Sequence, residues 1–267
     1  MDADDRDLSP VLEPAPGEFR LWPAVRLVAL FPEQTDRDAV VRALGRGLGV
    51  SPEQLRTREV EDRAWEREWL RDFHAMRFGQ RLWVCPRHER VEDPNAAVVT
   101  MDPGLAFGTG THPTTALCLE WLDSHPPRDG TVVDFGCGSG VLALAALRLG
   151  ARSASCFDID PQALIATRDN ASANGLSAQV RLCDSAGTIP RGAGLLLANI
   201  LSGPLVELAP LFTDIVGPGC ELVLSGLMEQ DVPGVERAYD TWFDMRTCGI
   251  RESWVCLWGR RNGRPRV

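Results

Sequence analysis

The sequence contains no lysine, because all 28 of its basic residues are arginine. The chain therefore lacks a Schiff-base lysine, the lysine of a phosphate-binding loop and a lysine general base. Its eight cysteines are scattered without a C-x-x-C pair, which argues against a metal site and favours a reducing compartment. No apolar run approaches the roughly 18 residues that a membrane span needs, and the acidic start is unlike a signal peptide. These absences predict a cytoplasmic protein that binds neither a membrane nor a metal.

The composition is that of a soluble globular protein of 267 residues, 44% of them hydrophobic and 24% charged. This length allows one large domain or two modest ones. The formal net charge of −9 argues against direct contact with nucleic acid, which needs clustered basic residues. It favours a basic partner instead.

Strand-like and helix-like segments alternate from about residue 97 onward. The predicted strands are 97–101, 131–135, 154–158, 179–183, 194–199, 220–225, 241–248 and 253–259, and the predicted helices are 112–125, 139–149, 161–174, 203–216 and 228–239. Such alternation is typical of a doubly wound α/β fold with a mostly parallel sheet. No helix separates the last two strands, so we expect them to pair as a hairpin with an antiparallel last strand.

The first part of the chain predicts a smaller α+β unit. It combines a strand over 19–31 with a helix over 36–48, after a proline-rich acidic lead. A charged helix over 59–74 follows, and then a strand over 81–85. The apolar face of the helix consists of Trp65, Trp69, Leu70 and Phe73. This face either packs in a core or docks two domains. We therefore expect a small N-terminal domain at 1–58, a linking helix and strand at 59–95, and the doubly wound domain at 96–267.

A glycine-rich turn separates the strand over 131–135 from the helix that follows. Gly136, Gly138 and Gly140 form a G-x-G-x-G pattern, whereas a dinucleotide fold would need glycine at Val141. The pattern suits a cofactor without phosphates, such as S-adenosylmethionine, although a purely structural turn would read the same. Asp158 ends the next strand and can accept both hydroxyls of a ribose. The sequence thus predicts a nucleoside site and disfavours a nucleotide-dependent oxidoreductase.

The loop over 102–115 contains glycines, threonines and a single aromatic residue, and leads into a helix. We expect Thr111 to be the helix N-cap and Pro113 to occupy the first turn. Thr114 and Thr115 could reach the carboxylate of the methionine part of the cofactor, or serve only as helix caps. Phe107 could lie against its apolar portion.

Polar residues at two further strand ends are candidates for the same site. Asn199 follows an apolar strand, and its amide oxygen can accept a hydrogen bond from an amine, although it could equally end the strand or cap a helix. Asp184 could contact the adenine amino group, or be a solvated loop acid. His112 could cap or pack a helix as well as act as an acid or base.

Taken together, four segments resemble the bacterial PrmA family, whose members methylate large-subunit ribosomal protein eleven. They are DPGLAFGTGTHPTT at 102–115, VDFGCGSG at 133–140, DIDPQA at 158–163 and ANILSGPL at 198–205. Residues 65–69 and 76–79 also look like the connecting region of that family. The resemblance covers residues 11 to 262, and its first segment is the most specific.

The resemblance implies a Rossmann-like class I methyltransferase with a seven-stranded sheet. It implies cofactor contacts at Thr115, Gly136, Asp158 and Asn199, to which Gly138 and Phe107 are added by their positions. Asn199 is the candidate catalytic residue. The implied reaction is the trimethylation of lysine ε-amines and of an N-terminal α-amine on a basic ribosomal protein, by a monomer whose N-terminal domain presents the substrate.

One departure from the family concerns the N-terminal domain. Family members begin with an additional strand and helix, so we expect either an incomplete recognition domain here or a start codon assigned too far downstream. Substrate docking could then be lost, which would leave a protein that only binds the cofactor. The same fold could also methylate another protein or a small-molecule amine. A nucleic-acid methyltransferase is disfavoured, because Ile200-Leu201-Ser202 follow Asn199 where Pro-Pro and an aromatic residue are typical.

Overall fold

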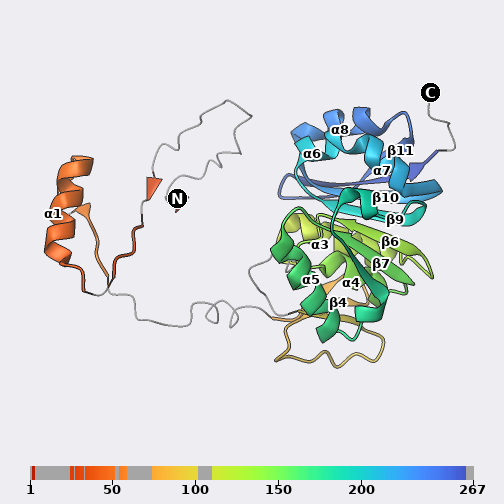
Figure 1. Cartoon of the computed structure of the whole chain (residues 1–267), viewed down its shortest axis with the longest axis horizontal. Helices are drawn as coiled ribbons and strands as arrows, with labels where there is room; N and C mark the ends of the chain where they lie inside the picture. The colour runs from red at the N-terminus through yellow and green to blue at the C-terminus, as the bar shows by residue number, and fades with distance from the viewer. Residues whose placement is uncertain are drawn as a thin grey trace. The chain divides into compact units, whose positions relative to one another are not determined.

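The computed structural model describes residues 2–3, 25–26, 28–32, 34–51, 54–58, 74–101 and 110–262. The chain forms two compact units, Met1–Arg63 and Ala64–Val267 (Figure 1). The predicted helix over 59–74 lies outside the described residues, apart from His74. The two expected boundaries, at 58/59 and 95/96, therefore stay predictions.

The first unit contains helix α1 (Arg37–Leu48), as the sequence predicts for 36–48. Asp36 caps it by accepting a hydrogen bond from Ala39 N at 3.0 Å, and Gly49 ends it in the left-handed conformation. The short strands β1 (Asp2–Ala3) and β2 (Val25–Arg26) pair antiparallel. The strand predicted over 19–31 is wrong for residues 28–31, which are exposed and lie outside any strand, because no described strand pairs with them.

The second unit is built on a seven-stranded sheet in the order β11-β12-β10-β9-β6-β7-β8. Its strands are β6 (Thr131–Phe135), β7 (Ser153–Phe157), β8 (Val180–Cys183), β9 (Ala193–Asn199), β10 (Val216–Met228), β11 (Phe243–Arg251) and β12 (Trp254–Arg261). Strands β6 to β10 are parallel, and β12 runs antiparallel between β10 and β11. The predicted hairpin turns at Glu252 and Ser253, both with positive φ. The predicted fold class is confirmed.

Alternate residues of the central strands pack into two separate hydrophobic cores, one on each face of the sheet. On β9, Leu195 and Leu197 belong to one core, whereas Leu196 and Ala198 belong to the other. The first core packs α3 (Pro113–Ser124), α4 (Val141–Arg148) and α5 (Pro161–Ala173), and the second packs α6 (Ser202–Glu207), α7 (Ala209–Ile215) and α8 (Val232–Tyr239). Helices therefore cover both faces of the sheet (Figure 1).

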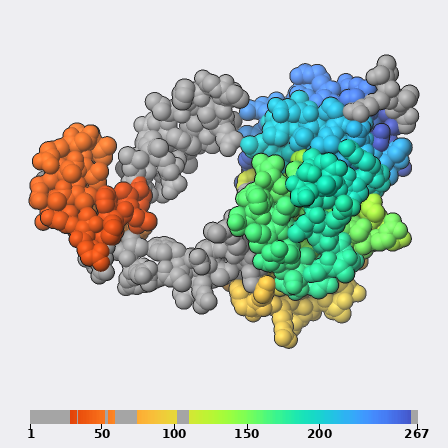
Figure 2. Space-filling model, viewed as in Figure 1, coloured from red at the N-terminus to blue at the C-terminus, as the bar shows by residue number. Residues whose placement is uncertain are grey.

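Residues 97–101 do not join the main sheet, contrary to the expected alternation. Strand β5 (Ala97–Thr100) pairs parallel with β4 (Leu82–Cys85), which pairs antiparallel with β3 (Met76–Phe78). The other edge of β5 is occupied by Asn174, whose side chain donates to Thr100 O at 2.7 Å and accepts from Thr100 N at 2.9 Å. This small sheet shares the core of α3 and α4, and Figure 2 shows it, in gold, against the body of the unit.

The helix predicted over 203–216 is divided into α6 and α7 at Leu208. Pro210 stands in the first turn of α7 and has no backbone N–H to continue the ladder from α6. The segment predicted as a helix over 228–239 likewise starts as a 3₁₀ turn at Glu229–Asp231 before α8 begins.

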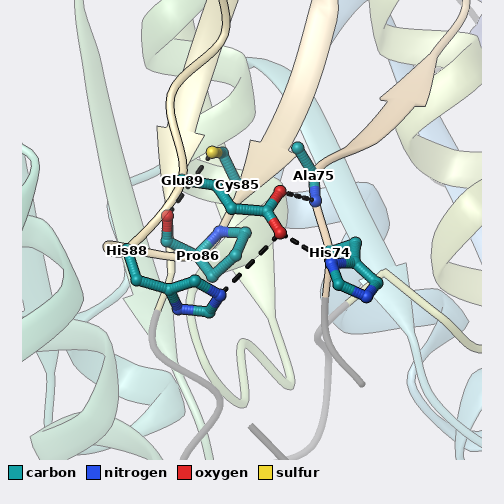
Figure 3. A network of polar contacts seen from close by, with 6 residues as sticks. All are labelled: His74, Ala75, Cys85, Pro86, His88 and Glu89. Atoms are coloured by element: carbon teal, nitrogen blue, oxygen red, sulfur yellow. Dashed lines mark hydrogen bonds and ion pairs between the residues drawn. The ribbon is translucent and has the colours of Figure 1, made fainter. Parts of the chain in front are cut away.

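Glu89 fixes the beginning of the described part of the second unit (Figure 3). One oxygen of its carboxylate accepts a hydrogen bond from Ala75 N at 2.8 Å, and the other lies 2.6 Å from His74 Nδ1. His88 Nε2 lies 3.8 Å from the same oxygen. The hydrogen bonds to His74 and Ala75 hold the pKa of Glu89 below its usual range.

Candidate functional site

The glycine-rich turn is tied to the end of the neighbouring strand β7. Gly136 N and Cys137 N both donate to Phe157 O, at 2.8 and 3.0 Å. Gly136, Gly138 and Gly140 all have positive φ, between 53° and 81°, which explains the need for glycine. Gly140 is also the N-cap of α4. The turn therefore lies at the carboxyl edge of the parallel strands, where doubly wound folds bind ligands.

Asp158 joins this turn through its carboxylate. Its Oδ2 accepts from Gly138 N at 2.9 Å, and its Oδ1 accepts from Asp160 N at 3.0 Å. An ionised carboxylate has about four acceptor positions, so two remain for the hydroxyls of a ribose. The predicted partners Gly138 and Asp158 are thus in direct contact.

Asp134, the last residue but one of β6, was not predicted from the sequence as a site residue. Its side chain is buried, and Oδ2 accepts from Ala143 N at 3.0 Å. The Oδ1 atom is buried with no hydrogen-bond partner in the described part of the chain. Burial raises the pKa of Asp134 to about 7, and nearby Asp158 adds to the rise. A buried acceptor without a donor, directly beneath the turn, fits a ligand that brings a hydrogen-bond donor.

A second pair of predicted residues meets across the edge of the sheet. Asn199, at the end of β9, donates from Nδ2 to Thr115 Oγ1 at 3.1 Å. Thr115 lies in the first turn of α3 and is 1% exposed. Because its amide nitrogen is used by Thr115, the amide oxygen of Asn199 remains available as an acceptor.

The N-cap of α3 is His112 and not Thr111, so that expectation is wrong. His112 Nδ1 accepts from Thr114 N at 3.3 Å and lies 2.8 Å from Thr114 Oγ1. The imidazole also packs edge-on against Trp254, with ring centroids 5.1 Å apart. An imidazole acceptor aimed at the first turn replaces the expected hydroxyl. His112 and Thr114 therefore belong to the helix cap.

Two other residues were predicted to contact the cofactor, Phe107 and Asp184. Phe107 lies outside the described residues. Asp184 is exposed and accepts from Thr188 Oγ1 at 3.1 Å, and its contact with the adenine amino group stays a prediction. Ile159, which was not predicted as a contact, is 90% exposed directly beside Asp158. An apolar residue between two acids at a strand end was the signal that could have identified it.

Two surface clefts of the described residues lie away from this site. One, of about 270 Å³, lies at the amino ends of β6 and β9, where Thr131 and Gly194 line it. The other, of about 340 Å³, lies between α3 and β11. Within the described ranges no cluster of His, Cys, Asp and Glu could hold a metal ion. None of the helices described is long and apolar enough to cross a membrane.

Known proteins are similar to this chain in both sequence and fold. The model of the family described as ribosomal protein L11 methyltransferase (PrmA) matches residues 1–262. The ribosomal protein L11 methyltransferase of Haemophilus influenzae (strain PittEE) is 47% identical over 262 residues, which cover 97% of this chain and 88% of the relative. That of Pectobacterium atrosepticum is 48% identical, covering 95% and 87%.

A solved structure agrees with these relatives. The ribosomal protein L11 methylase from Lactobacillus delbrueckii subsp. bulgaricus superposes with a TM-score of 0.65 at 28% identity, covering 71% of this chain and all of that chain. The family model, the sequence relatives and this solved structure all indicate the same family. This chain belongs to the ribosomal protein L11 methyltransferase (PrmA) family and is an S-adenosylmethionine-dependent protein methyltransferase.

Proposed function

We propose that this chain transfers methyl groups from S-adenosylmethionine to amino groups of ribosomal protein L11, at lysine ε-amines and the N-terminal α-amine. The observation that carries the proposal is the Asn199–Thr115 hydrogen bond, because it orients an amide acceptor at the carboxyl edge of the sheet. The names of the relatives support the choice of substrate.

The residues around the glycine turn fit the cofactor. When bound, S-adenosylmethionine supplies a methyl group on a positively charged sulfur that is already reactive toward a neutral amine. We assign the ribose hydroxyls to Asp158, whose carboxylate keeps free acceptor positions beside Gly138. The backbone of Gly136 and Gly138 lines the turn. Ile159 offers an exposed apolar surface beside the ribose position.

Two further assignments concern the methionine part of the cofactor. Thr115 and Phe107 are assigned to its polar and apolar portions, respectively. The unpartnered Oδ1 of Asp134 is a suitable acceptor for an ammonium group beneath the turn. A cation at that position would also favour the ionised form of Asp134.

Asn199 is assigned to the incoming amine. Its amide oxygen would accept a hydrogen bond from the amine and hold the nitrogen lone pair in line with the methyl carbon. Such orientation lowers the barrier without a strong base. An incoming ammonium must first lose a proton, to water or to a nearby acceptor.

The net charge of −9 supports a basic protein substrate, because opposite charge speeds encounter and raises its local concentration. A ribosomal substrate also supports a cytoplasmic location, where the eight free thiols would stay reduced. We expect the enzyme to act as a monomer and to make no direct contact with nucleic acid.

The test uses the absence of lysine from this chain. Purified enzyme is incubated with ribosomal protein L11 and S-adenosylmethionine labelled in the methyl group, and the proteins are hydrolysed. Every labelled methyl-lysine then comes from the substrate, and peptide mass spectrometry assigns its position. We expect label on L11 with the native enzyme and with Asp244→Ala, a control at an exposed residue near the amino end of β11, and a strong loss with Asn199→Ala. Label on a different protein or a small amine, with none on L11, would contradict the proposal.

A further inference from the structure

Ile200, the residue after Asn199, is closely approached by two glycines, one in the glycine turn and one on β10. On one side lies Gly136 of the glycine turn: a Cβ built on Gly136 would overlap Ile200 Cγ2. On the other side lies Gly226 of β10: a Cβ there would lie 2.7 Å from the carbonyl carbon of Ile200 and 3.0 Å from its nitrogen. Both approaches are closer than real Cβ atoms tolerate, so both positions require glycine.

The backbone adds a third constraint on Ile200. Its N–H donates to Ser225 O at 3.1 Å, and Ser225 is itself fixed because its hydroxyl donates to Val255 O at 3.2 Å. Gly226 then departs from the regular ladder: the pairing of β10 with β12 shifts register between Leu224 and Leu227. This bulge allows β10 to lie against the backbone of Ile200.

The glycine turn and the acceptor strand are therefore connected through Ile200. Gly136 lies two residues before Gly138, which contacts Asp158, and Ile200 directly follows Asn199. We infer that Ile200 is a positioning residue for methyl transfer, held between Gly136 and Gly226 so that Asn199 keeps its place relative to the glycine turn. This inference rests on the proposed role of Asn199.

The first experiment replaces Gly226 with alanine. The new Cβ meets backbone atoms of Ile200, so the segment carrying Asn199 must move. A displacement of about 1 Å at a reacting group can reduce turnover by about 10²-fold. We expect Gly226→Ala to lower kcat by at least tenfold, while the Kd for S-adenosylmethionine, measured by calorimetry, stays within about threefold.

Gly219→Ala is the matched control. Gly219 lies on the same strand with φ 75°, but a Cβ there meets nothing within 4 Å. Gly219→Ala therefore has the backbone strain of an alanine with positive φ, but its Cβ does not touch Ile200 or any other residue. We expect its kcat within about twofold of the native enzyme. Equal kcat for the two alanine variants, or an equal loss of cofactor affinity and kcat in Gly226→Ala, would overturn the inference.

Substitutions of Ile200 give a second test that does not depend on whether Gly226→Ala folds. Ile200→Ala removes the side chain that fills the space, and should lower kcat with little change in cofactor affinity. Ile200→Val keeps the Cγ2 methyl group that faces Gly136, and should restore most of the activity. If valine behaves like alanine, or both behave like the native enzyme, Ile200 has no positioning role.

A double-mutant cycle measures the contact without any activity assay. Gly136→Ala clashes with a side-chain atom that Ile200→Ala removes, so the two losses of unfolding free energy should be clearly less than additive. Gly226→Ala clashes with backbone atoms, so Ile200→Ala should give it no such relief. Additivity in the first cycle would refute the contact. Inactivity of the native enzyme toward L11, with these couplings intact, would count against the proposed function alone.

Discussion

The side chain of Asn199 donates a hydrogen bond to the hydroxyl of Thr115, 84 positions earlier in the chain, at 3.1 Å. This bond joins the end of a central strand to the first turn of α3. Its consequence is directional: the amide nitrogen faces Thr115, and the amide oxygen is left for another donor. Thr115 thereby determines which end of the amide is presented.

Thr115→Val tests this orientation. Valine keeps the shape but removes the acceptor, so the amide of Asn199 loses the bond that fixes its rotation. We expect kcat to fall by about tenfold, the equivalent of roughly 1–1.5 kcal/mol for one hydrogen bond. Thr115→Ser keeps the hydroxyl and should stay close to the native value in the same steady-state assay. A serine variant as slow as the valine variant would mean that the methyl group matters and the bond does not.

Asp158→Ala should weaken the binding of S-adenosylmethionine by about 10- to 100-fold. The substitution removes a charged acceptor for the ribose, and hydrogen bonds to charged groups contribute about 1.5–3 kcal/mol. The substitution also removes the hydrogen bond that Asp158 Oδ2 accepts from Gly138 N. Calorimetry measures the affinity, with Asp244→Ala as the control at an exposed acid on β11. Unchanged affinity in Asp158→Ala would remove Asp158 from the ribose site.

Asp134 gives the stability of the free enzyme a pH dependence. A pKa of about 7 in the folded state, against the ordinary 3.8 of an aspartic acid, means that between these pH values the folded state holds a proton that the unfolded chain releases. Stability is therefore highest below about pH 4 for this group, and falls as pH rises toward 7 by up to about 4 kcal/mol. Asp134→Asn should flatten this decline.

Urea unfolding at pH 5, 6, 7 and 8, without cofactor, measures the effect of Asp134. The free energy of unfolding of Asp134→Asn should rise relative to that of the native chain as the pH rises, because the amide carries no charge to bury. Asp184→Asn provides the comparison with an exposed acid. A constant difference between Asp134→Asn and the native chain across this range would show that Asp134 does not change its protonation there.

Glu89 should respond to acid in the opposite direction. Its pKa is lowered by His74 and Ala75, so its bonds are complete above the unfolded-state value of about 4.5 and are lost as pH falls through the lower, folded-state pKa. In Glu89→Gln, the amide of Ala75 should exchange faster with solvent, as seen by NMR. Exposed Glu92→Gln should leave that amide protected. Equal protection in both variants would show that Glu89 does not hold Ala75 in place.

The main sheet could be predicted from the sequence because its strands are apolar runs separated by helices with clear signals. The strand predicted over 131–135 coincides with β6, and Asp158 and Asn199 lie at the strand ends where ligands bind. Pattern alone sufficed there, because parallel strands place their carboxyl ends at one edge. The positions of these side chains followed from the topology.

Other features depend on contacts that a one-dimensional pattern does not carry. The apolar run at 97–101 reads like the strands that follow it, and only its pairing with β4 places it in a second sheet. The cap of α3 had two neighbouring candidates, and the packing of His112 against Trp254 decided between them. The close approach of Gly136 to Ile200, where a Cβ would overlap Cγ2, has no signal in the sequence. Long-range packing decided all three.

The side chain of Asn174 occupies the outer edge of β5 and pairs with both backbone groups of Thr100. An uncovered edge of this kind is a template on which a second molecule can add a strand and begin to aggregate. A single amide that imitates the next strand removes that template at Thr100, at the cost of one side chain. Asn174 thereby protects the small sheet from edge-to-edge association.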